Sequence, residues 1–274
     1  WNNKKYWNSY YSKSDKNKFS RPSKFGIFFF KKFLKKDNYL LELGCGNGRD
    51  TFCFYRKTKN IVSIDESLQT IKKNIFLIKK KNKNIKFLNC KFENFTIKKK
   101  INIVYARFFL HAINLNQENK LISFFIKIKK YCKVKVALEF RTNKDKLLEK
   151  GKIVGKNERF TNHYRRFIDV NKFLKKIKKN GCKIIYMKQG TNFSKTKDEN
   201  PHLCRIVFEL WKKIQHIFLH IFPWMLLNFF ITKRDPLKQS IHKNFSDPYL
   251  PKGPNNSDKL FFRQNYYFKL DKVK

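Results

Sequence analysis

The chain has 274 residues, a length that suits one full domain with an extension. Its net charge of +44 indicates attraction to polyanions, but only 11 of its 64 basic residues are Arg, and the basic residues are spread along the whole chain. A dedicated nucleic-acid surface would use more forked Arg contacts, so we expect non-specific nucleic-acid attraction only. The six cysteines form no C-x-x-C pair. This argues against a metal site or a disulfide framework and favours a reducing, cytoplasmic compartment.

Three regions follow one another along the chain. Residues 1–38 are aromatic and basic, and we expect them to form a lid segment with a helix at 24–36. Residues 39–210 alternate strand and helix patterns. Apolar runs predict strands at 39–43, 60–65, 84–89, 101–106, 134–140, 182–188 and 203–210. Periodic patterns predict helices from about Asp50 and at 68–80, 116–131 and 169–180, the last capped by Asp169 and stopped by Gly181. The alternation predicts an α/β fold, with a Rossmann-like, seven-stranded, mostly parallel sheet and helices on both faces.

A glycine-rich turn follows the first predicted strand. Glu42 ends that strand, and glycines follow at 44, 46 and 48. Glycine lets the backbone turn sharply and lets a ligand approach closely. The next strand ends at Asp65, where an acid can accept both ribose hydroxyls of a nucleoside. The E-x-G-x-G-x-G spacing fits the G-x-G-x-x-G pattern of nicotinamide and flavin enzymes poorly; a turn without a ligand is the plainer alternative.

Polar residues that can carry chemistry follow the later strands. Arg107 and His111 come after the fourth strand, and Arg141 ends the fifth. A denser polar cluster spans 159–169. Five of the eleven arginines are in these segments, and their planar forked donors suit a carboxylate or phosphate. The plainer alternative for 159–169 is a solvated turn before a helix, with Arg165 or Arg166 paired to Asp169.

Together these motifs resemble the class I S-adenosylmethionine-dependent methyltransferases. The residues that carry the resemblance are Gly-Cys-Gly-Asn-Gly-Arg-Asp at 44–50, Arg-Phe-Phe-Leu-His-Ala-Ile at 107–113, Glu-Phe-Arg-Thr at 139–142 and His-Tyr-Arg-Arg-Phe-Ile-Asp at 163–169. The resemblance implies that the cofactor is S-adenosylmethionine and that the last strand runs antiparallel to the rest. It places the cofactor site at Glu42, Gly44, Cys45, Gly46, Gly48, Asp65, Glu66, Asn89, Phe92 and Arg107. Family members often have an Asp after the third strand, where this chain has Asn89 and Cys90.

The acceptor is the less defined part of the hypothesis. The chain looks like small bacterial methyltransferases encoded with surface-polysaccharide and phosphoglycan genes, which implies O-methylation of an anionic glycan or a phosphate-bearing small molecule. No Asn-Pro-Pro-Tyr or Asp-Pro-Pro-Tyr follows the fourth strand, which argues against a base amine as acceptor. We expect His111, His163 and Tyr164 to be catalytic, and Tyr11, Arg107, Arg141, Arg165 and Arg166 to bind the acceptor. An RNA methyltransferase and a non-catalytic cofactor-binding protein at the membrane are the alternatives.

Residues 211–274 form a C-terminal extension. Within it, 214–232 is an apolar stretch flanked by lysines, with Pro223 and Trp224 inside. It is short for a transmembrane helix, which needs roughly 20 apolar residues. We expect a helix that lies in a membrane interface, so the protein would be cytoplasmic with peripheral membrane contact. The alternative is a helix packed on the core. The rest of the extension is expected to be irregular.

Overall fold

A computed structural model describes residues 3–13, 21–78, 85–97 and 100–211. In this part of the chain, seven strands form one mixed sheet in the order β3-β2-β1-β4-β5-β10-β9. The strands are β1 (Tyr39–Leu43), β2 (Asn60–Asp65), β3 (Ile85–Asn89), β4 (Ile103–Arg107), β5 (Val134–Arg141), β9 (Cys182–Gly190) and β10 (Leu203–Leu210). All seven were predicted, with shifts of at most two residues at their ends. The α/β prediction is therefore confirmed.

The sheet has the parallel and antiparallel pairs that the resemblance implied. Strands β1 to β5 pair in parallel, while β10 runs antiparallel to both of its neighbours, β5 and β9. The chain order reverses between β1 and β4, which lie side by side at the centre. In an open α/β sheet, ligands bind beyond the carboxyl ends of the strands at such a reversal. Topology alone thus places the site beyond Leu43 and Arg107.

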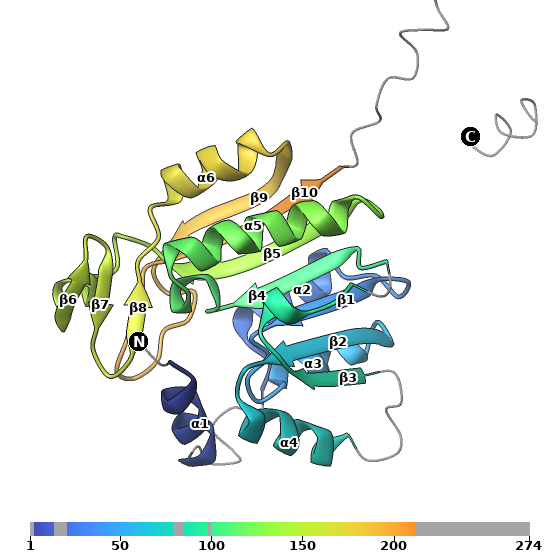
Figure 1. Ribbon diagram of the computed structural model, residues 1–274, viewed down its shortest axis with the longest axis horizontal. Helices are drawn as coiled ribbons and strands as arrows, with labels where there is room; N and C mark the ends of the chain where they lie inside the picture. Colours follow the sequence, from blue (N-terminus) through green and yellow to red (C-terminus); the bar gives the residue numbers. More distant parts are fainter. Residues whose placement is uncertain (1–2, 14–20, 79–84, 98–99, 212–274) are drawn as a thin grey trace, which may run out of the picture. The chain divides into compact units, whose positions relative to one another are not determined.

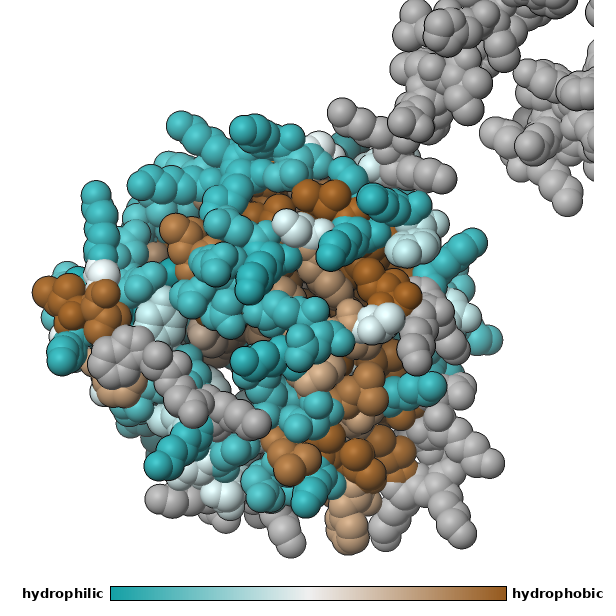
Figure 2. Space-filling model, viewed as in Figure 1, coloured by the Kyte–Doolittle hydropathy of each residue, from teal (hydrophilic) through white to brown (hydrophobic). Residues whose placement is uncertain are grey.

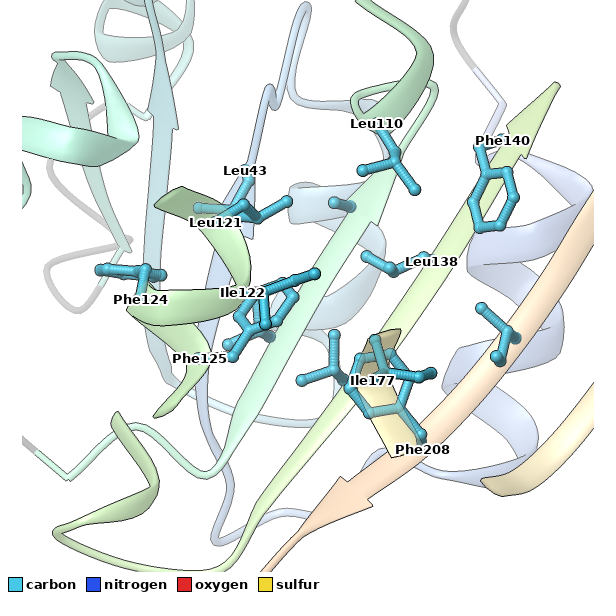
Figure 3. Packing of buried hydrophobic residues seen from close by; sticks show 14 of the residues in the cluster. Leu43, Leu110, Leu121, Ile122, Phe124, Phe125, Leu138, Phe140, Ile177 and Phe208 are labelled. Atoms are coloured by element: carbon cyan, nitrogen blue, oxygen red, sulfur yellow. The ribbon is translucent and has the colours of Figure 1, made fainter. Parts of the chain in front are cut away.

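Helices cover both faces of this sheet (Figure 1). The six α-helices in the described residues are α1 (Asn3–Lys13), α2 (Lys24–Lys32), α3 (Arg49–Tyr55), α4 (Leu68–Leu77), α5 (Leu115–Lys129) and α6 (Val170–Lys179). Side chains alternate across a strand, so Leu41 and Leu43 face the cluster under α5 and α6, whereas Leu40 faces the cluster under α2 and α3. Figure 3 shows the first cluster, with Leu121 and Phe125 of α5 packed on the strands.

The ends of α4 and α6 carry residues that favour helix termini. The Asp169 side chain accepts a hydrogen bond from the Lys172 amide at the start of α6, as predicted. Gly181 follows α6 with a φ of +75°, a left-handed conformation that suits glycine. Ser67 caps α4 in the same way as Asp169 caps α6, because its hydroxyl accepts from the Thr70 amide. Ser67 directly follows the Asp65-Glu66 pair, so this cap fixes the chain where β2 ends.

A second, smaller sheet departs from the sequence-based interpretation. Three short antiparallel strands, β6 (Lys152–Gly155), β7 (Glu158–Phe160) and β8 (Tyr164–Arg166), lie between β5 and α6 in the chain. The 159–169 cluster is therefore not a solvated turn: Arg165 and Arg166 are buried, and Arg166 pairs with Glu118 of α5 rather than with Asp169. Figure 1 shows this small sheet and α1 on the same side of the large sheet, the side toward which β4 points.

Hydrophilic residues cover most of the viewed face, and apolar residues show only in separate areas (Figure 2). None of the helices in the described residues is long and apolar enough to cross a membrane. The predicted interfacial helix at 214–232, and most of the proposed 211–274 extension, lie outside the described residues. The proposed division of the chain into 1–38, 39–210 and 211–274 stays a prediction.

Candidate cofactor and acceptor site

The glycine turn after β1 lies at the centre of the site. Gly44, Gly46 and Gly48 have φ values of +65°, +52° and +73°, which side chains other than glycine rarely adopt. A Cβ on Gly44 would lie 2.9 Å from the Phe109 ring, and one on Gly46 would overlap the Tyr11 hydroxyl. Two aromatic side chains thus lie directly against the bare backbone of this turn.

Asp65 ties the end of β2 to the glycine turn. One carboxylate oxygen accepts the Gly46 amide at 2.9 Å, and the other accepts the Ser67 amide at 2.8 Å. Each oxygen has a second lone pair, so the carboxylate can still accept two hydroxyl groups. Burial raises the pKa of Asp65, and the two amides oppose that rise. These two acceptor oxygens fit a ribose diol, the role that the resemblance implies.

Glu42 lies beneath the turn rather than at its surface. It is buried, and its carboxylate accepts hydrogen bonds from the hydroxyls of Thr51 on α3 and Ser63 on β2. Burial raises its pKa to about 8; the nearby charge of Asp50 adds to the rise, and the two hydroxyls oppose it. Glu42 of β1 is therefore hydrogen-bonded to both α3 and β2. This placement favours positioning of the turn over direct contact with a ligand.

Four other residues of the predicted cofactor site differ in their burial and partners. The Asn89 amide donates to the Asp65 carbonyl at 3.0 Å, which leaves its oxygen to accept a hydrogen bond from an amino group. Phe92 is instead buried in the core, with its ring edge-on to Phe109 and Phe124. Cys45 is also buried, and burial raises the pKa of its thiol well above the usual value. Glu66 is half-buried beside Asp65.

Helix α1 lies over both halves of the site. On the cofactor side, the backbone carbonyl of Tyr11 accepts a hydrogen bond from the Lys73 ammonium group of α4. The side-chain oxygen of Asn8 accepts one from the Ser67 hydroxyl. On the other side, the Asn3 amide donates to the carbonyl of Ala112, in the short helix η2 (Leu110–Ala112) after β4. The structure places Tyr11, predicted to bind the acceptor, against Gly46 on the cofactor side.

The acceptor-side arginines differ in their partners. Arg107 and Arg205 both donate to the buried carboxylate of Glu139, at 2.9 and 2.6 Å. Arg141 pairs with Asp145 and Glu199, and Arg166 pairs with Glu118. Within the described residues, Arg165 has no carboxylate at ion-pair distance, although its exposed fraction is only 8 %. A buried arginine without such a partner is costly unless an anion arrives.

The two predicted catalytic histidines are both buried, but their ring nitrogens differ. The Nδ1 of His111 accepts the Arg141 amide at 3.2 Å, so its proton is on Nε2. The Nδ1 of His163 has no hydrogen-bond partner among the described residues, and Tyr6 stacks on its ring at 4.1 Å. Burial, then the charges of Arg165 and Arg141, lowers the pKa of His163 to about 3. Both rings are therefore neutral at physiological pH.

Tyr164 and four residues outside the predicted set complete the site. Burial, then the nearby charge of Glu158, raises the pKa of Tyr164, so its hydroxyl stays protonated. Phe109 and Glu139 lie inside motifs that carry the resemblance, but no local pattern assigned them a role, and Glu199 lies in none of the predicted elements. Arg49 follows the last glycine of the motif, and its charge lies near Tyr11 and Arg107. Its position in Gly-Arg-Asp was the one available signal.

The fold and the turn together define a class of protein. A seven-stranded sheet with an antiparallel β10, a glycine turn after β1 and an acid after β2 form the frame of a class I methyltransferase. Residues 34–216 match the family model of a methyltransferase domain. Because the match covers more than half of the 274 residues, the chain belongs to this family. It is an S-adenosylmethionine-dependent methyltransferase, which sets aside the non-catalytic alternative.

Solved structures share this fold at low sequence identity. An S-adenosylmethionine-dependent methyltransferase from Clostridium acetobutylicum is 14% identical, with a TM-score of 0.53 over 73% of this chain and 94% of that one. One from Methanosarcina mazei is 10% identical, with a TM-score of 0.57 over 68% and 98%. The glycopeptide N-methyltransferase MtfA, solved with S-adenosyl-L-methionine, is 11% identical, with a TM-score of 0.51 over 72% and 90%. A comparison with curated proteins found no match.

Proposed function

We propose that the protein methylates an oxygen atom of an anionic glycan or of a phosphate-bearing small molecule. The observation that carries this proposal is Arg165, a buried arginine with no carboxylate at ion-pair distance among the described residues. Two other arginines of the acceptor side, Arg141 of β5 and Arg166 of β8, are buried as well. Guanidinium groups recognise carboxylate and phosphate by paired hydrogen bonds, which a neutral acceptor does not satisfy.

The chemistry needs little more than position. S-adenosylmethionine supplies an electrophilic methyl group, and the protein has to align an acceptor oxygen with it. A phosphate oxygen needs no general base, whereas a sugar hydroxyl must lose its proton. For a hydroxyl acceptor, we assign the proton-accepting role to His163, because the Nδ1 of His111 already accepts the Arg141 amide. Burial and the charges of Arg165 and Arg141 lower the pKa of His163, and the anion of a bound acceptor would offset those two charges. His111 would then hold the end of β5 in place through the Arg141 amide, and its Nε2–H group would be a hydrogen-bond donor.

A methyl-transfer assay tests this proposal. Purified protein would be incubated with methyl-labelled S-adenosylmethionine and matched acceptors: sugar phosphates, glycans with carboxylates, the corresponding neutral sugars, and RNA. We expect label in the anionic small molecules and glycans, in a bond that mild acid leaves intact. Labelled neutral sugars with unlabelled anionic partners would contradict the assignment of the arginines.

The RNA methyltransferase alternative rests on the net charge of +44. Lysines spread over the surface predict RNA binding that weakens steeply with salt, because released counterions drive it. We therefore expect RNA retention to be lost between low and moderate salt, without preference among RNAs. A structured RNA that binds selectively at high salt and accepts label would make the RNA enzyme the better assignment.

The same proposal extends to location. A lipid-linked phosphoglycan would present an anion to the arginines and a membrane surface to the apolar stretch 214–232. The protein would then be cytoplasmic and peripheral at the inner face of the membrane. Vesicle binding by the full chain and by a chain that lacks residues 212–274 tests this part of the proposal.

A further inference from the structure

Two buried arginines on the acceptor side lie near the same two acids, but only Arg141 is at ion-pair distance from them. Arg141 at the end of β5 pairs with Asp145 and with Glu199. Arg165 of β8 is close enough for its pKa to be lowered by Arg141 and raised by Glu199, although burial is the largest cause of its shift. Two positive charges therefore face two negative ones across elements that are far apart in the sequence.

Asp145 is a fixed member of this group. Its carboxylate is buried, and it accepts the amides of Leu147 and His202 as well as the Arg141 guanidinium. Three bonds from three different parts of the chain hold it in one position. A ligand cannot displace it without breaking the β5 end, so Asp145 is a structural counter-ion for Arg141.

Glu199 is held much more weakly. Its side chain is 43% exposed, and the bond to Arg141 is the one hydrogen bond of its carboxylate within the described residues. Its backbone belongs to a tight turn, where Thr196 and Glu199 exchange hydrogen bonds. An ion pair at an exposed position contributes little, because water and salt compete with it. Glu199 can therefore leave Arg141 at low cost if another anion replaces it.

Arg165 has donors to offer that anion. In the described chain its hydrogen bonds to Thr161 and Asn162 all use Nη1, so Nε and Nη2 keep their hydrogens for a ligand. These two nitrogens form one edge of the guanidinium, the edge that meets carboxylate or phosphate oxygens in pairs. Next to it, the His163 ring is neutral and adds no further charge.

We propose that Glu199 is an internal occupant of the acceptor's anion site, and that a carboxylate or phosphate of the acceptor replaces it between Arg141 and Arg165. This inference rests on the proposed function, because it specifies how that function's acceptor is held. The site would select acceptors by charge, since a neutral acceptor cannot displace a carboxylate from a buried arginine. Glu199 also keeps Arg141 paired when no acceptor is bound.

Anion titrations of the full chain test the exchange. Methyl phosphate and acetate, as minimal phosphate and carboxylate probes, would be titrated by calorimetry into the wild type, Glu199→Gln and the matched control Asp198→Asn. Glu199→Gln keeps the size of the side chain but removes the competing charge. We expect it to tighten binding of at least one probe by about five-fold, the upper range for an exposed ion pair. Asp198→Asn removes a charge from the neighbouring exposed residue and should change the affinity less than two-fold, roughly.

A second pair of variants locates the bound anion. Arg165→Lys keeps the charge but loses the fork, and we expect it to weaken binding by about ten-fold. Arg159→Lys is the control, because Arg159 of β7 donates to the carbonyls of Gly155 and Glu158. If Glu199→Gln binds no better than Asp198→Asn, or if no probe binds any variant, the proposal is overturned. Whether the better probe is methyl phosphate or acetate identifies the anion.

The titrations separate this inference from the proposed function. They would be run with and without S-adenosylhomocysteine, whose own affinity is measured in the same samples. Anion exchange at Glu199 with no methylation of anionic acceptors would retain the site and reject the proposed reaction. Methylation of anionic acceptors with equal affinities in wild type and Glu199→Gln would retain the reaction and reject the exchange.

Discussion

At the scale of single residues, Asp65 allows the most direct test of the cofactor hypothesis. Its carboxylate orders the turn through the Gly46 and Ser67 amides and still has acceptor capacity for a ribose. We expect Asp65→Ala to weaken S-adenosylhomocysteine binding by about 1–3 kcal/mol, because charge-assisted hydrogen bonds are lost. Calorimetry would measure this, with the exposed Asp198→Ala as the control. Unchanged affinity would place the ribose elsewhere.

Glu42 gives a prediction about stability and pH. Its pKa is raised from 4.5 to about 8 in the folded protein, mainly by burial. As the pH rises between these values, the unfolded chain has already released this proton, while the folded chain still holds it. The free energy of unfolding must therefore fall across this range, by up to about 1.4 kcal/mol per pH unit from this group.

The variant Glu42→Gln isolates that contribution. Glutamine keeps an oxygen that can accept from the Thr51 and Ser63 hydroxyls but does not titrate. We expect urea unfolding of the variant to show a shallower loss of stability from pH 5 to 8.5, roughly, with the largest gain over wild type at the alkaline end. The exposed Glu149→Gln controls for loss of a carboxylate. Parallel pH profiles for wild type and Glu42→Gln would mean that Glu42 titrates normally.

At the scale of elements, α1 connects the two halves of the site. Its Tyr11 side chain lies against the glycine turn. The ring centres of Tyr6 and Trp7 lie 4.1 and 4.9 Å from the centre of the His163 ring. None of the α1 residues belongs to the three buried hydrophobic clusters found in the described chain. The helix can therefore be removed with little expected damage to the core.

Deletion of residues 1–13 should uncover His163. Burial is the largest cause of its pKa of about 3, so we expect the pKa to rise toward 6.5, although Arg165 and Arg141 still oppose protonation. Proton NMR titration of the histidine rings would measure the shift, with His202 as an internal control. S-adenosylhomocysteine affinity should fall in the same variant, because Tyr11 is lost. A His163 titration that does not change would show that α1 does not cover it.

The elements also show what the sequence can and cannot predict. The seven strands of the large sheet were predicted because long apolar runs and the Gly44–Gly48 turn are strong local signals. The strands of the small sheet have three or four residues, too few to show alternation, so they were not predicted and a turn remained the alternative for 159–169. Pairing between distant residues, such as Arg107 with Glu139 or Arg141 with Glu199, depends on the sheet order and on loop geometry. No local pattern contains that information.

At the scale of the whole molecule, the buried core of the described residues lies before the proposed C-terminal extension. Every residue of the three clusters found in the described chain lies between Phe25 and Leu210, and the family model ends at residue 216. Trp211 is the last described residue, and Lys133 lies 3.8 Å from the centre of its ring. A chain that ends at Trp211 should therefore keep its fold, and the role of the extension can be tested by removing it.

Deletion of residues 212–274 separates the two hypotheses for the apolar stretch 214–232. If the stretch lies in a membrane interface, the full chain should sediment with anionic vesicles, and the truncated chain should stay in the supernatant. The truncated chain should keep its S-adenosylhomocysteine affinity and its thermal midpoint, because the cofactor turn and the core are intact. Neutral vesicles and a full chain with Trp224→Ser are the matched controls, since apolar insertion and charge act together. Truncated protein that sediments as well as the full chain would assign the binding to the surface lysines, and truncated protein that unfolds would assign the stretch to the core.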